Sequence, residues 1–181
     1  MRIEDLNWMD VEKYLKHDDR LMLVVGACEQ HGYLSLLSDV KIPLALADAA
    51  SKQTGVLVAP PVNFGSSPYF LSFPGTFSLR LSTLMDAVED IVRSAYGQGF
   101  KRILVLNGHG GNSALLNVAN RELRLAHGLM TFLTHPGVPP DLVERLGDHP
   151  HGLQDDPALG LLEVVQPAER KVGVLGLPLV A

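Results

Sequence analysis

Four short, predominantly apolar runs set the strongest limit on what this chain can fold into. Each run is only a few residues long and ends at a polar or glycine-containing stretch; the runs are Leu21–Ala27, Val56–Ala59, Ile103–Leu106 and Leu129–Leu133. A strand that is apolar on both faces is typical of a parallel sheet covered by helices on both sides. The runs therefore predict the central strands of an α/β fold.

The stretches between these runs have the spacing of amphipathic helices. In the clearest of them, Thr83–Tyr96, apolar residues fall on one face, Thr83 and Asp86 resemble a capping box, and Gly97 follows. Three further helices are expected at Val11–Leu15, Pro43–Lys52 and Ser113–Ala126. Strands that alternate with helices predict a three-layer α/β/α sandwich with a mostly parallel central sheet.

The composition excludes several classes of protein. With 181 residues, we expect one domain over residues 1–181. The net charge is −5 and no Lys/Arg cluster stands out, which argues against a nucleic-acid partner. The N-terminus lacks the layout of a signal peptide, and no apolar run approaches the roughly 20 residues that cross a bilayer. A single cysteine, Cys28, excludes an internal disulfide. We expect a soluble cytoplasmic protein with no membrane partner.

Polar residues follow the first predicted strand. Glu29, His31 and Asp39 lie within a short segment, and Gly32 permits a turn that brings Asp39 back toward the other two. Oxygen and nitrogen ligands of this mixture suit Zn²⁺, Mn²⁺ or related ions. The alternative is a solvated loop with ordinary hydrogen bonds.

A glycine-rich junction, NGHGGN, follows the third predicted strand and leads into a helix. His109 stands at its centre, as a metal ligand or general base would, and Gly110, Gly111 and Asn112 precede free N–H groups that suit an anion or a developing oxyanion. The alternatives are a turn with an incidental histidine and a phosphate cradle. The junction lacks the Lys-Ser/Thr of a P-loop and the spacing of a dinucleotide fingerprint.

Two other segments contain candidate site residues. In Ser66–Leu79, a Phe-Pro-Gly-Thr turn and the hydroxyls of Tyr69, Ser72 and Thr76 are candidates for substrate hydrogen bonds, against a plain loop. In Gly147–Pro157, histidines and carboxylates are close enough to complete a metal shell or act in acid–base chemistry; these are His149, His151, Asp155 and Asp156. The alternative for this second segment is a solvent-exposed loop.

Three motifs in this order resemble the creatininase (creatinine amidohydrolase) family: EQHGYLSLLSD, FPGT and NGHGGN, over roughly residues 20 to 130. The resemblance implies an α/β/α sandwich and a divalent-metal site with two ions per subunit, of Zn²⁺, Mn²⁺ or Fe²⁺. It also implies hydrolysis of a non-peptide linear or cyclic amide of a small molecule by metal-activated water, and a homo-oligomer.

By position in these motifs, the resemblance assigns the metal to Glu29, His31, Asp39 and His109, with Asp39 as the bridging carboxylate. It implies that Asp156 completes the shell and that His151 acts in acid–base catalysis.

The late part of the chain departs from the family pattern. The motif His-Ala-Gly-x-x-Glu-Thr is not intact, and the chain is shortened after about residue 130. A catalytically impaired relative that serves as a ligand-binding or assembly protein is therefore the second hypothesis.

Overall fold

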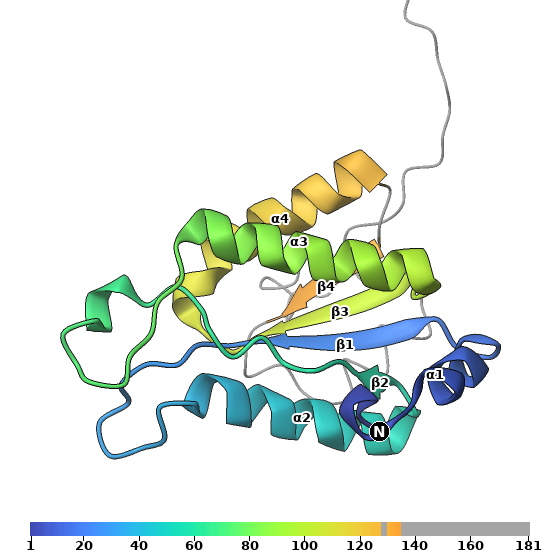
Figure 1. Ribbon diagram of the computed structural model, residues 1–181, viewed down its shortest axis with the longest axis horizontal. Helices are drawn as coiled ribbons and strands as arrows, with labels where there is room; N and C mark the ends of the chain where they lie inside the picture. The colour runs from blue at the N-terminus through green and yellow to red at the C-terminus, as the bar shows by residue number, and fades with distance from the viewer. Residues whose placement is uncertain (128–129, 135–181) are drawn as a thin grey trace, which may run out of the picture.

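A four-stranded parallel sheet forms the centre of the computed structural model, which describes residues 1–127 and 130–134 (Figure 1). Its strands are β1 (Arg20–Val25), β2 (Leu57–Val58), β3 (Arg102–Asn107) and β4 (Met130–Thr134). They lie in the order β2-β1-β3-β4, and every neighbouring pair is parallel. The parallel sheet predicted from the four apolar runs is confirmed.

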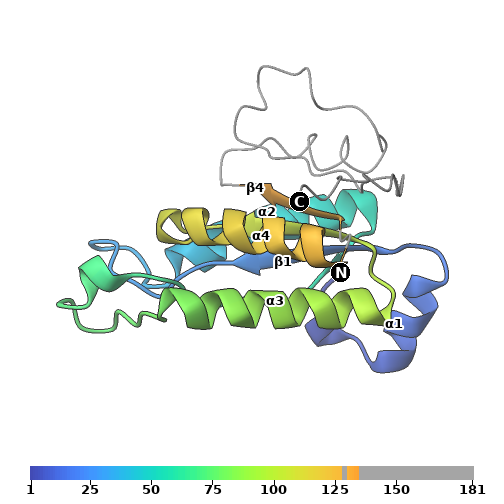
Figure 2. The same cartoon turned by 90° about the horizontal axis from the view of Figure 1, so that it is seen from above.

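Helices cover both faces of the sheet (Figures 1 and 2). Helix α2 (Ser38–Thr54) lies on one face, and α3 (Leu81–Gln98) and α4 (Ser113–His127) lie side by side on the other. The shorter elements are α1 (Trp8–Leu15) and the 3₁₀ turns η1 (Ile3–Asp5), η2 (Pro68–Phe70) and η3 (Gly110–Asn112). The expected three-layer α/β/α arrangement is confirmed. Within the described ranges, none of the helices is long and apolar enough to cross a bilayer.

Strand β1 shows why the central strands are apolar on both faces. Leu21, Leu23 and Val25 join the core under α3 and α4, whereas Met22 and Val24 join the core under α2. All five side chains are buried, because successive side chains of a strand point to opposite faces and both faces are covered.

Two helix starts differ from the prediction. Helix α3 begins at Leu81 after an N-cap, Arg80, that makes no side-chain capping bond, and it continues through Gly97, so the expected capping box is wrong. Helix α2 begins at Ser38 and contains Pro43 in its interior. Proline has no N–H, so the Asp39 carbonyl receives no bond from position 43 and is left at the helix surface.

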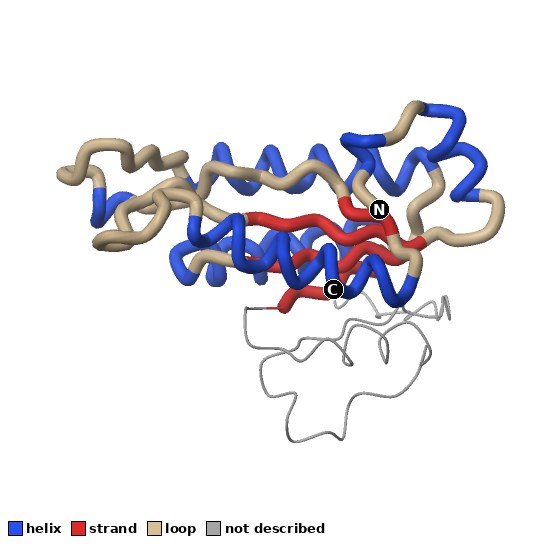
Figure 3. The backbone as a smooth tube through the Cα atoms, turned by 90° about the horizontal axis from the view of Figure 1, so that it is seen from below, coloured by secondary structure: helices blue, strands red, loops and turns tan. Residues whose placement is uncertain are grey.

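The chain reverses its direction across the sheet between β1 and β3. After β1 it adds β2 on one side, and after β2 it crosses over to add β3 on the other side. The ends of β1 and β3 are in register, with Val25 opposite Asn107, and the longest loops gather at that end of the molecule (Figure 3). Such a switch point is where open parallel sheets bind ligands.

Two glycines allow the first turn of α2 to press against these strand ends. A Cβ atom on Gly108 would lie 1.9 Å from the Asp39 carbonyl oxygen, and one on Gly26 would lie 2.5 Å from the same oxygen. Both distances are too short for any side chain. The absence of a Cβ at these two positions therefore fixes how closely Asp39 approaches both strands.

We expect Gly108→Ala to lower the free energy of unfolding by about 1–3 kcal/mol, the usual effect of overpacking a tight contact. Urea denaturation of the two proteins measures this difference. Gly97→Ala is the matched control, because a Cβ there meets no atom within 4 Å and lies in helix α3. The control should be as stable as the wild type or slightly more stable. Equal stability of Gly108→Ala and wild type would show that the contact is loose.

Candidate functional site

Glu29 and His31 lie on the loop that leaves the carboxyl end of β1. The loop turns at Gly32, whose φ of +58° is in the left-handed region that favours glycine. The backbone N–H of Glu29 donates to the Leu36 carbonyl at 2.9 Å and closes the loop. Helix α2 starts directly after it, so Asp39, in the first turn of that helix, returns to the same place.

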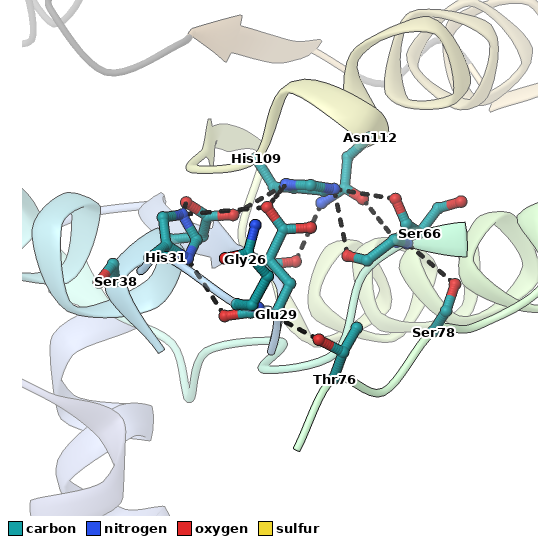
Figure 4. Close-up of polar contacts among 12 residues, drawn as sticks. Gly26, Glu29, His31, Ser38, Ser66, Thr76, Ser78, His109 and Asn112 are labelled. Atoms are coloured by element: carbon teal, nitrogen blue, oxygen red, sulfur yellow. Dashed lines mark hydrogen bonds and ion pairs between the residues drawn. The ribbon is translucent and has the colours of Figure 1, made fainter. Parts of the chain in front are cut away.

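His109 reaches this loop from the end of the neighbouring strand, β3 (Figure 4). Its Nδ1 atom lies 2.8 Å from Oδ2 of Asp39 and 3.4 Å from Oε1 of Glu29. The candidate ligand atoms of these three residues all lie within 4.8 Å of one another. Glu29 is only 5% exposed and His109 only 7%, so two carboxylates and an imidazole share one buried place.

His31 faces the same carboxylates from the other side. Its Nε2 atom lies 3.0 Å from Oδ1 of Asp39 and 3.9 Å from Oε1 of Glu29. Its Nδ1 atom lies 3.2 Å from the backbone carbonyl of Glu29. The two oxygens of Asp39 therefore face two different imidazoles, His31 and His109.

The residues fit a divalent metal ion. Carboxylate oxygens and imidazole nitrogens are the ligands that Zn²⁺ and Mn²⁺ take in proteins. Among the described residues, Oε2 of Glu29 is buried without a hydrogen-bond partner, a situation that is rare for a carboxylate unless a cation satisfies it. Both imidazoles also have one nitrogen beside a backbone carbonyl, which leaves the other for an ion.

The pKa of the His109 imidazole is raised above its ordinary value. Burial by itself lowers the pKa of this imidazole, but the hydrogen bond to Asp39, the Ser66 carbonyl and the charge of Glu29 raise it by more. The pKa therefore lies above its usual value of 6.5. Below this pKa, Nδ1 of His109 carries a proton, and a metal ion that binds Nδ1 has to displace that proton.

The side chains of Thr76 and Asn112, predicted to contact substrate, are bonded within the protein. Thr76 is the last residue of a Phe-Pro-Gly-Thr turn, as expected, with Gly75 at φ +87°. Its hydroxyl accepts from the N–H of Gln30 at 3.2 Å. Asn112 is 0% exposed, and its amide bonds two backbone groups. Both residues connect loops around the site, so substrate contact by their side chains stays a prediction.

The other predicted substrate residues lie in η2 and directly after His109. Tyr69 is in η2 and is 91% exposed. Gly110 and Gly111 directly follow His109; a Cβ on Gly111 would lie 2.4 Å from the Ser66 carbonyl, whereas one on Gly110 would meet nothing within 4 Å. The predicted residues His151 and Asp156, with their neighbours His149 and Asp155, lie outside the described residues.

Sequence reasoning missed the part played by Ser66. Its carbonyl lies 2.8 Å from Nε2 of His109, and its N–H donates to Oδ1 of Asn112 at 3.0 Å. Both groups belong to the backbone, so the residue type carries no signal for them. The adjacent hydroxyl of Ser67 lies 3.4 Å from the same Nε2 atom.

Comparison with known proteins identifies similar sequences. A family model for creatininase, described as creatinine amidohydrolase, matches residues 4–165. The chain is 36% identical over 141 residues to a creatinine amidohydrolase of Pseudomonas putida, which covers 72% of this chain and 54% of that protein. It is 38% identical over 111 residues to a mycofactocin precursor peptide peptidase of Mycolicibacterium smegmatis, and this match covers 58% of this chain and 44% of that protein. Both names denote hydrolases, and the chain spans about half the length of these relatives.

Solved structures with the same architecture include metal forms. A Zn–Zn form of a creatininase variant aligns with a TM-score of 0.67 and 31% identity, over 84% of this chain and 65% of that one. A Mn creatininase aligns with a TM-score of 0.66 and 29% identity, also over 84% and 65%.

We expect the affinity for Zn²⁺ or Mn²⁺ to fall as the pH decreases below the raised pKa of His109. One proton is displaced from this imidazole, so the loss is about tenfold for each pH unit. Above that pKa the imidazole is neutral, so His109 no longer makes the metal affinity depend on pH. Isothermal titration between pH 6 and pH 9 in two buffers of different ionisation enthalpy measures both the affinity and the proton release. An affinity that is independent of pH, with no proton released, would show that His109 is not a ligand.

We expect Glu29→Gln to weaken metal binding by more than about 100-fold, beyond the usual effect of losing an outer-shell partner. Without metal, the free energy of unfolding of the variant should equal that of the wild type or exceed it by up to about 1 kcal/mol. The reason is that a neutral amide of the same shape replaces a buried and poorly paired carboxylate.

Glu89→Gln is the matched control for this substitution. Glu89 pairs with Arg93 on α3, away from the candidate site, so the control should bind metal as the wild type does. Normal metal affinity in Glu29→Gln would remove Glu29 from the ligand set.

Proposed function

The chain belongs to the creatinine amidohydrolase (creatininase) family, and on that premise we propose that it is a metal-dependent amidohydrolase. The substrate we propose is a small molecule with a linear or cyclic amide C–N bond, cleaved by activated water. The observation that carries the proposal is the buried group of Glu29, Asp39 and His109 at the switch point of the sheet.

Four residues of the described chain would hold the metal: Glu29, His31, Asp39 and His109. Asp39 is the natural carboxylate to be shared by two ions, because its two oxygens face different imidazoles. A divalent ion supplies positive charge that polarises the amide carbonyl and lowers the pKa of water. We propose Zn²⁺, Mn²⁺ or Fe²⁺, with two ions per subunit.

The protein groups have separate tasks in this proposal. His31 and His109, each beside a backbone carbonyl, stay in fixed orientations and resist being displaced by substrate. Gly110 and Gly111 directly follow His109, and we propose that their backbone N–H groups stabilise the oxyanion that develops on the amide. The N–H of Asn112 is not available for this task, because it donates to the His109 carbonyl at 3.1 Å. From the resemblance alone, His151 is proposed as an acid–base residue and Asp156 as the carboxylate that completes the metal shell.

The loops beside the site favour an uncharged substrate. Residues 30–37 and 56–79 contain no Asp, Glu, Lys or Arg. The two loops are joined by the N–H of Gln30, which donates to the Thr76 hydroxyl at 3.2 Å. Their exposed large side chains are apolar or aromatic: Tyr33, Leu34, Leu36, Phe64, Tyr69, Leu71, Phe73 and Phe77. A neutral amide loses less hydration than an ion on such a surface.

A second candidate is a metal-binding relative that no longer hydrolyses its ligand. The late His-Ala-Gly-x-x-Glu-Thr pattern of the family is not intact in this chain, and this departure supports the second candidate. Assembly as a homo-oligomer and the absence of nucleic-acid and membrane partners stay predictions, as does a cytoplasmic location.

The proposal predicts metal-dependent release of amine from a neutral amide. The full chain, loaded with Mn²⁺ or Zn²⁺, is incubated with a panel of neutral, anionic and cationic amides that includes creatinine, and products are measured by liquid chromatography. Asp39→Asn should lower kcat/KM by at least about 100-fold, because it removes a carboxylate that faces both histidines.

Asp90→Asn, an exposed carboxylate on α3, is the control and should keep full activity. Equal activity of Asp39→Asn and wild type contradicts the proposed function. Metal binding without hydrolysis of any amide in the panel favours the second candidate.

A further inference from the structure

Asn112 is completely buried at the start of α4, and its amide connects two loops that come from different strands. Its Nδ2 atom donates to the Gly26 carbonyl at 3.0 Å, just after β1. Its Oδ1 atom accepts from the N–H of Ser66 at 3.0 Å, on the loop that follows β2. Both ends of the amide are therefore bonded to backbone.

The backbone that Asn112 holds also bonds His109. The N–H of Ser66 donates to Oδ1 of Asn112, and the carbonyl oxygen of Ser66 lies 2.8 Å from Nε2 of the His109 imidazole. A carbonyl oxygen can only accept, so Nε2 carries a proton. The other ring nitrogen, Nδ1, is the one that faces Asp39 and Glu29. The Ser66 carbonyl thus decides which nitrogen of His109 is available to a metal ion.

Close packing leaves this arrangement little freedom. A Cβ on Gly65 would lie 2.5 Å from the Gly26 carbonyl oxygen and 2.7 Å from Oδ1 of Asn112. A Cβ on Gly111 would lie 2.4 Å from the Ser66 carbonyl oxygen. The loop that follows β2 is therefore pressed directly against the Asn112 amide and the His109 ring.

We propose that Asn112 is a positioning residue for the metal ligand His109. It fixes the Ser66 carbonyl, which keeps the proton on Nε2 and presents Nδ1 to the ion. This inference rests on the proposed metal site and gives Asn112 a task other than substrate contact. The residue acts through Ser66, because its own amide is already bonded to Gly26 and Ser66.

The first test measures metal affinity. Asn112→Ala in the full chain should bind Zn²⁺ and Co²⁺ about 10–100-fold more weakly by isothermal titration, the usual effect of losing an outer-shell partner. The visible absorption spectrum of the Co²⁺ form should change as well, because it reports ligand geometry. Leu123→Ala, which removes a buried core side chain from the same helix, is the control for lost stability and should bind metal within about twofold of the wild type.

The second test needs no variant at position 112. In the wild-type chain labelled with ¹⁵N-histidine and loaded with Zn²⁺, nitrogen–proton correlation spectra should show His109 with a proton on Nε2 and metal on Nδ1. The signal is assigned by its absence from His109→Gln. Metal on Nε2 overturns the inference, and so does an Asn112→Ala variant that binds metal as tightly as Leu123→Ala.

The two proposals fail in different ways. If the wild type binds no metal, the proposed function fails. The positioning role is then still tested in the metal-free chain, where the Nε2 proton of wild-type His109 should exchange slowly with water and that of Asn112→Ala should exchange rapidly. Equal exchange rates in the two proteins overturn the positioning role.

Discussion

Two carboxylates and an imidazole are held together at the end of a sheet whose strands are otherwise apolar, and their mutual interaction governs this part of the molecule. Burying one carboxylate without a partner is unfavourable, and burying two side by side is more so. In the metal-free chain the histidines supply the compensation, which is why the pKa of His109 is raised although burial opposes it. Such an arrangement favours the binding of a cation, which would pair with both carboxylates.

The architecture brings these groups together through short connections. Among the candidate ligands, Asp39 lies in the first turn of α2 and His109 lies just after β3, so rigid elements set their positions. Gly26 and Gly108 bring the first turn of α2 against both strand ends, and Pro43, which has no N–H, donates no helix hydrogen bond to the Asp39 carbonyl there. The same turn carries the Asp39 carboxylate that faces both histidines.

Sequence patterns were sufficient for the sheet and for the grouping of the candidate site residues. The apolar runs identified the strands because burial on both faces leaves no alternation of polar residues, and motif order identified Glu29, His31, Asp39 and His109 as neighbours. The patterns failed at helix starts. The capping residues expected at Thr83 lie inside α3, and Pro43 lies inside α2, because packing against the sheet extends both helices beyond their local signals. The roles of Ser66 and Asn112 depend on backbone groups from distant loops, which no residue type reports.

The Asp39–His109 contact joins residues that lie 70 positions apart in the chain, on different elements of the sandwich. Closing so long a loop has an entropic cost, and the contact forms only when β1, β3 and α2 are all in place. A ligand that binds the native arrangement and not the unfolded chain stabilises the former by mass action. If the proposed metal ion binds only the folded chain, the supply of metal would therefore also set the fraction of the protein that is folded.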